Sequence, residues 1–119
     1  AIASHHMPQH WDDKTCEFEY AKNGAIGLQT LFGVMNNLGM PLDQLISMLT
    51  IAPREIVGLT IPEIKIDNPA CITMFDPDAI YIFEQSMIRS LSNNSPFIGK
   101  SMKGAIVGII HKNQTIIHS

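Results

Sequence analysis

The chain has 119 residues, 45% of them hydrophobic and 16% charged, which is typical of one folded domain and excludes a disordered segment. A formal net charge of -3 and eight scattered Lys and Arg residues exclude a basic nucleic-acid-binding face. The least interrupted apolar stretch, residues 24–35, is too short to cross a bilayer, so we expect no membrane span. The two cysteines, Cys16 and Cys71, match no metal-binding spacing and predict reduced thiols in a cytoplasmic protein.

The first residues combine a short apolar run with a polar loop. Ala1–Ser4 predicts a brief strand, and a lone strand needs neighbours that must come from outside this chain. The loop that follows, residues 5–13, contains His5, His6, His10 and Trp11. Enzymes of the α/β class place their chemistry just after a strand, so a metal site and a solvated loop with incidental histidines both stay open here.

Three short helices are expected next. In residues 24–37, apolar side chains recur with the i, i+3, i+4, i+7 spacing of one helix face, at Leu28, Leu31, Phe32 and Met35. Pro41 opens a second helix, because proline suits a first helical turn. The buried face expected for this helix is Leu42, Leu45, Ile46 and Leu49, and a third helix is expected at residues 53–57.

From residue 59 the pattern predicts a small β unit. The expected strands are residues 64–66, 70–75, 80–83, 105–110 and 115–117. Turn residues at 76–78 separate the second and third strands, residues 92–96 form a loop, and residues 112–114 join the last two strands into a hairpin. His111 and His118 lie in or beside this hairpin and are interpreted as surface residues.

Several motifs stand in a fixed order along almost the whole chain. They are His5-His6-Met7-Pro8, Glu19–Gly24, Ile26–Thr30, Ala52–Leu59, Ala70–Asp78, and Ser95–Gly99 followed by Lys103-Gly104. In this order they resemble the final stretch of class I dihydroorotases, a family of cyclic amidohydrolases. Its corresponding segments include Asp-His-Ala-Pro-His, Pro-Phe-Gly, Gly-Leu-Glu-Thr and Asn-Pro-Ala-Arg-Ile-Leu-Gly-Leu.

The resemblance implies an α/β fold: the carboxy-terminal end of a metal-dependent (β/α)8 (TIM) barrel, followed by part of a small β domain. Residues 1–58 would supply the last barrel strand, the active-site loop and the terminal helices. Residues 59–119 would be the carboxy-terminal segment of the β domain. The chain would then be a fragment of a larger protein and inactive on its own.

The resemblance also implies a chemistry. The family is a group of zinc hydrolases that interconvert dihydroorotate and carbamoyl aspartate in pyrimidine biosynthesis. Zinc would be held in the full-length parent mainly by residues that precede this chain, and the fragment alone is expected to hold none. His5 stands where the family has a catalytic, metal-contacting aspartate. Imidazole can coordinate zinc or accept a proton but supplies no negative charge, so loss or change of activity is expected.

By the same resemblance, three further positions would face the substrate. Gln9, four residues after His5, replaces a histidine that binds the substrate carboxylate; slipping the register by one would put His10 there instead. Asn23 replaces a phenylalanine beside Gly24, which is retained and would hold the substrate through backbone groups. His6 is interpreted as a structural residue that ties the loop to the barrel.

These substitutions leave other functions open. One alternative is a catalytically degenerate dihydroorotase-like subunit that binds a partner enzyme; another is an allantoinase- or hydantoinase-like cyclic amidohydrolase. The expected partners are the rest of the chain's own barrel, a small cyclic amide, and either a second copy or the transcarbamoylase of the preceding step. Neither nucleic acid nor a membrane is expected as a partner.

Overall fold

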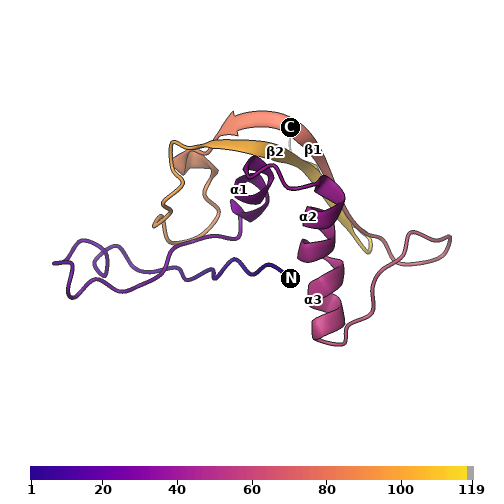
Figure 1. Ribbon diagram of the computed structural model, residues 1–119, viewed down its shortest axis with the longest axis horizontal. Helices are drawn as coiled ribbons and strands as arrows, with labels where there is room; N and C mark the ends of the chain where they lie inside the picture. The colour runs from indigo at the N-terminus through magenta and orange to yellow at the C-terminus, as the bar shows by residue number, and fades with distance from the viewer. Residues whose placement is uncertain (118–119) are drawn as a thin grey trace.

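The structure, a computed structural model, describes residues 1–117, so His118 and Ser119 lie outside the described residues. Its helices are α1 (Leu31–Asn37), α2 (Leu42–Leu49) and α3 (Ile51–Ile56), and its strands are β1 (Cys71–Ile82), β2 (Ser101–His111) and β3 (Gln114–Ile117). A 3-10 turn, η1 (Gln85–Met87), follows β1. The result is a small α/β unit with a three-stranded antiparallel sheet in the order β1-β2-β3. The sheet arches over α1, while α2 and α3 form a column beside it (Figure 1).

The first helix is shorter than the sequence predicted. It begins at Leu31 and not at Gly24. The preceding amides donate their hydrogen bonds to distant segments: Ile26 to the carbonyl of Asn94 at 3.2 Å, and Gly27 to the ring of His6 at 3.1 Å. An amide used in this way cannot bond within a helix, so residues 24–30 remain a loop.

The next two helices confirm the sequence prediction with small changes of boundary. Pro41 stands at the N-cap of α2, and Leu45 on the expected apolar face is fully buried. Helix α3 begins at Ile51, two residues before the expected start, so that Pro53 falls in its first turn. Among the described residues no helix has the length and apolar character that a membrane crossing requires.

One continuous strand replaces the two strands expected around residues 76–78. Strand β1 pairs with β2 on both sides of that segment, Phe75 with Ile106 and Ile80 with Lys103, with the register shifted in between. Within the bulge, the Asp76 carboxylate accepts hydrogen bonds from the backbone amides of Asp78 and Ala79, at 2.9 and 3.2 Å. The expected turn is therefore a bulge, because β2 is long enough to pair beyond it.

Two other expected strands are absent from the described residues. Residues 64–66 lie in an open loop, with Ile64 and Ile66 87% and 94% exposed. Ala1–Ser4 is extended but forms no ladder. Within residues 1–117, neither segment has a neighbouring strand that pairs with its backbone groups. The closing hairpin is confirmed as β2 and β3, with His111 exposed.

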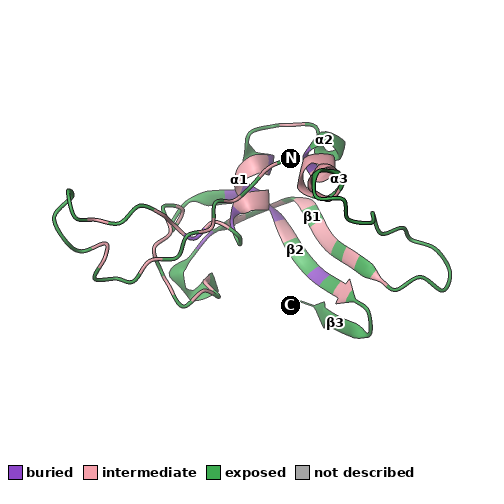
Figure 2. Cartoon of the chain, turned by 90° about the horizontal axis from the view of Figure 1, so that it is seen from below, coloured by how far each residue is buried: buried purple, intermediate pink, exposed green. Residues whose placement is uncertain are grey.

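Buried residues lie where α1 packs against β2 (Figure 2). Gly33 of α1 is buried against Met102, which is 1% exposed, and a Cβ at Gly33 would lie 3.0 Å from the Met102 Cβ. Phe32 meets Phe75 edge to face with ring centroids 5.0 Å apart. Burial raises the pKa of the nearby Tyr81 phenol above its usual value near 10, so this side chain stays neutral.

A buried asparagine ties the same helix to both main strands. The Asn36 amide donates to the carbonyls of Pro77 in the β1 bulge, at 2.8 Å, and Lys103 in β2, at 3.1 Å. The bulge carbonyl thereby gains a partner that the sheet does not supply. Asn37 adds a bond to the Ser101 carbonyl at 2.7 Å. Helix α1 thus fixes where β1 and β2 lie relative to each other.

Replacing Gly104 tests this packing. In Gly104→Ala the new Cβ would lie 2.5 Å from a ring carbon of Phe32 and 3.0 Å from the Asn36 amide nitrogen. Gly99→Ala is the matched control, because both glycines have left-handed φ angles, +99° and +77°, but among the described residues no atom lies within 4 Å of a Cβ built on Gly99. Urea denaturation should show that Gly104→Ala costs about 1–3 kcal/mol more than the control. Equal losses in the two variants would contradict the packing described.

Candidate functional site

The N-terminal loop is held against the segment before α1. His6 and Ala25 form a parallel bridge, and the Met7 amide donates to the Ala25 carbonyl at 2.9 Å. The His6 ring nitrogen Nδ1 accepts bonds from the amides of Gly27 and Leu28 at 3.1 and 3.3 Å. His6 is therefore a structural residue that holds the N-terminal loop through its bonds to the backbone of residues 27–28.

Three of the expected site residues lie together. The Gln9 side-chain nitrogen donates to the Asn23 carbonyl at 3.0 Å, and it would lie 3.2 Å from a Cβ built on Gly24. This bond uses one of the two protons on that nitrogen. The Gly24 amide and the Asn23 side chain make no hydrogen bond within the described residues. The cluster therefore keeps donors available for a ligand.

A residue with a side chain at position 24 would displace the N-terminal loop at Met7. The φ of Gly24, +119°, is one that side chains rarely adopt. An added Cβ would lie 2.6 Å from the Met7 Cβ and 2.8 Å from the Met7 carbonyl oxygen. The close approach of the two segments therefore requires glycine.

His5 is exposed and separate from this cluster. Its φ of +45° is in the left-handed region, which histidine adopts more readily than most residues. Its imidazole makes no hydrogen bond or ion pair within the described part of the chain. Across residues 1–117, no three His, Cys, Asp or Glu side chains are placed to hold a metal ion together. These residues alone do not fit a zinc ion, which takes three or four protein ligands.

His10, the alternative to Gln9, is engaged elsewhere. Its Nδ1 accepts the Asp12 amide at 3.3 Å, and the Asp12 carboxylate lies equally close. Only a neutral ring can accept the amide proton at Nδ1, so this bond and an ion pair cannot form together. The ring is exposed and makes no bond to Asn23 or Gly24. Among the described residues it is therefore Gln9, and not His10, whose side chain contacts Asn23.

The sequence analysis missed a third segment of the site, residues 92–94. The Ser92 hydroxyl donates to the Gln9 carbonyl at 2.6 Å, and the Asn94 side chain contacts both the Gln9 amide and the Gly24 carbonyl. An open hollow of about 720 Å³ lies between this segment and residues 8–11. A run of small polar residues was the available signal, but nothing in it indicated which loop it would meet.

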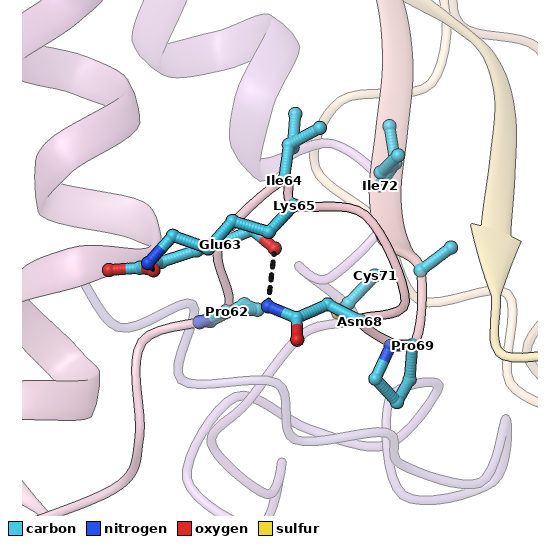
Figure 3. Close-up of a pocket in the computed structure, with 9 residues that line it drawn as sticks. Pro62, Glu63, Ile64, Lys65, Asn68, Pro69, Cys71 and Ile72 are labelled. Atoms are coloured by element: carbon cyan, nitrogen blue, oxygen red, sulfur yellow. Dashed lines mark hydrogen bonds and ion pairs between the residues drawn. The ribbon is translucent and has the colours of Figure 1, made fainter.

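A second hollow lies away from these residues. It has a volume of about 140 Å³ and is lined by the loop from Pro62 to Ile72 (Figure 3). The Asn68 side chain points back to the Glu63 carbonyl at 3.4 Å, and Lys65 pairs with Glu63. Its polar groups therefore bond to one another, and none of the expected site residues lines it.

The fold and the loop cluster define a small α/β unit that presents an open hollow beside its N-terminal loop. No family model matches the chain. The chain is 36% identical to a dihydroorotase of Citrifermentans bemidjiense over 98% of its own length and 28% of that protein's. It is 38% identical to one of Geotalea daltonii, over 88% of the chain and 26% of the relative, and 34% identical to one of Chlorobaculum tepidum, over 98% and 28%.

These comparisons confirm the resemblance predicted from the motifs. The chain is similar to the dihydroorotases over nearly its whole length. It spans about a quarter of the length of the curated relatives it matches, which is the coverage that a carboxy-terminal portion would give. The barrel expected from the family is not part of the structure, whose described residues form only the small α/β unit.

Replacing Gly24 tests the close approach of the two loop segments. Gly24→Ala should push Met7 away and weaken its bond to the Ala25 carbonyl. Amide exchange measured by NMR should therefore be at least about tenfold faster at Met7 in this variant. Gly39→Ala is the control, because Gly39 has a φ of +74° with open space around it. If amide exchange at Met7 were equally fast in both variants, the close approach of Gly24 to Met7 would not be what holds the two loop segments together.

Proposed function

We propose that this chain is the carboxy-terminal portion of a dihydroorotase-like hydrolase and supplies the substrate-facing loop of its active site. The observation that carries the proposal is the cluster of Gln9, Asn23 and Gly24. These residues are brought together by hydrogen bonds at the positions where the family resemblance puts substrate contacts. The aligned dihydroorotases cover 98% of the chain, which supports the same function.

In this proposal residues 1–58 belong to the end of a (β/α)8 barrel and residues 59–119 to a small β domain. The two parts are not independent, because α1 of the first packs on β2 of the second. Zinc in the parent would polarise the amide and activate water, and its ligands would lie mainly outside this chain. A cytoplasmic location, and a second copy or a transcarbamoylase as partner, belong to the same proposal.

The residues of this chain would hold the substrate. The remaining proton on the Gln9 side-chain nitrogen can donate to a substrate carboxylate, but a neutral amide binds it more weakly than a charged group would. The Gly24 amide, which has no partner within the described residues, can donate to a second substrate oxygen. Gln9, Asn23 and Gly24 together would orient the ring, since positioned donors fix the geometry of the reacting bond.

His5 would determine how fast the protein hydrolyses its substrate. It stands where the family has an aspartate, and it lacks the negative charge that a carboxylate brings to proton abstraction. We therefore expect slow ring opening of dihydroorotate by the full-length protein. A positioned proton-transfer group contributes about 10²- to 10⁴-fold to a rate.

A substitution at His5 tests the proposal. In the full-length protein, His5→Asp should raise kcat for dihydroorotate at least about tenfold, and His5→Ala should lower it. The assay follows dihydroorotate and carbamoyl aspartate by chromatography, with allantoin and hydantoin as comparison substrates. Turnover of either comparison substrate in place of dihydroorotate would reassign the substrate. If neither the parent nor His5→Asp turned over any of the three, the degenerate partner-binding subunit would replace the enzyme as the better account.

A further inference from the structure

Two segments about eighty residues apart in the sequence meet at the candidate site. Residues 8–11 and residues 90–94 line the same open hollow. The second segment belongs to the long loop between β1 and β2, which otherwise has no part in the proposed chemistry. Its Asn94 contacts both sides of the candidate substrate loop, on Gln9 and on Gly24.

The Asn94 side chain uses both ends of its amide. Its Oδ1 accepts the Gln9 backbone amide at 3.4 Å, and its Nδ2 donates to the Gly24 carbonyl at 3.0 Å. Its own backbone carbonyl accepts the Ile26 amide at 3.2 Å. One residue therefore spans the two segments that carry Gln9 and Gly24, and it fixes the distance between them.

Ser92 completes this arrangement. Its hydroxyl lies between the Gln9 carbonyl and the Asn94 side-chain oxygen, and it bonds to both. A hydroxyl has one proton and donates to one acceptor at a time, so the two contacts share it. The backbone of Gln9 is thus held at its amide by Asn94 and at its carbonyl by Ser92, which leaves its side chain to meet a ligand.

We propose that Asn94 is a positioning residue for substrate binding, acting through Gln9 and Gly24. This inference rests on the proposed function of the loop. A carboxamide supplies a donor and an acceptor on two separate atoms of one short side chain, so asparagine suits this place, and aspartate would keep only the acceptor contact. By holding the Gly24 carbonyl, Asn94 also restrains the residue whose own amide would face the substrate.

The matched control is the neighbouring residue. Asn93 is exposed, and its side chain makes no hydrogen bond within the described residues. Asn93→Ala removes the same chemical group from the same loop and from the lining of the same hollow, but it breaks no bond to Gln9 or Gly24, so amide exchange at Gln9 is the readout that separates the two variants. A general effect of altering this loop would therefore appear in both Asn93→Ala and Asn94→Ala.

The test compares Asn94→Ala, Asn94→Asp and Asn93→Ala in the full-length protein. Asn94→Ala should raise the KM for dihydroorotate, or its Kd by calorimetry, about tenfold while kcat stays within about twofold. Amide exchange at Gln9 should be at least about tenfold faster in Asn94→Ala and unchanged in Asn93→Ala. In Asn94→Asp the Gln9 amide should stay protected, because an acceptor remains, while affinity still falls because the Gly24 bond is lost.

The outcomes separate this inference from the proposed function. If the unsubstituted protein neither bound nor turned over dihydroorotate, the proposed function would fail and this inference with it. If it bound normally and Asn94→Ala matched Asn93→Ala in affinity and exchange, only the positioning role of Asn94 would be overturned. If Asn94→Ala did not fold, Asn94→Asp would decide: unchanged affinity in that variant would overturn the proposal.

Discussion

The packing of α1 against β2 is the contact on which the rest of the structure depends. Gly33 lets the helix approach Met102 closely, and Gly104 leaves room in the strand for the Phe32 ring. The Asn36 amide, buried at the same place, bonds to both β1 and β2. Most other segments are exposed, so the described unit has little other buried surface to stabilise it.

This contact also reaches the candidate site. The loop between β1 and β2 is closed at its base by bonds that join Phe83 to Lys100 and to Gly99, at 3.0 and 2.8 Å. Just before α1, the Gln29 side chain bonds to Met87 and Arg89 of that loop, at 2.9 and 2.7 Å. The loop that leaves the sheet therefore returns past the start of α1 to deliver Ser92 and Asn94 to the site. The strands set the position of the loop, and the loop sets the spacing of Gln9 and Gly24.

The elements that could be predicted from the sequence are those that depend on residues close together in the chain. Pro41 and the apolar spacing of Leu42, Leu45, Ile46 and Leu49 were sufficient to predict α2. The β2–β3 hairpin followed from its β-branched strands and polar turn. The turn residues at 76–78 indicated a break in the chain, but whether it would be a hairpin or a bulge depended on the length of β2, which no local pattern gives. Residues 24–30 had a helical pattern, but long-range bonds to His6 and Asn94 override it.

At the candidate site, too, the features that could be predicted differ from those that depend on contacts between distant residues. Gln9, Asn23 and Gly24 could be predicted because the family resemblance places them by motif, and the structure brings them together. Asn94 could not, because its role depends on a contact across 85 positions of sequence with Gln9. The metal-binding role expected for His5 stays a prediction, because the described residues place no other candidate ligands with it.

Amide exchange over a series of urea concentrations tests most directly whether the rest of the structure depends on the packing of α1 against β2. The Val34 amide in α1 and the Phe83 amide at the base of the sheet are both hydrogen-bonded, at 2.9 and 3.0 Å. They should exchange only on global unfolding, with one shared free energy and urea dependence, while the Met7 amide in the loop opens at lower free energy. A Val34 amide that exchanged independently of Phe83, or a Met7 amide as protected as both, would contradict the account.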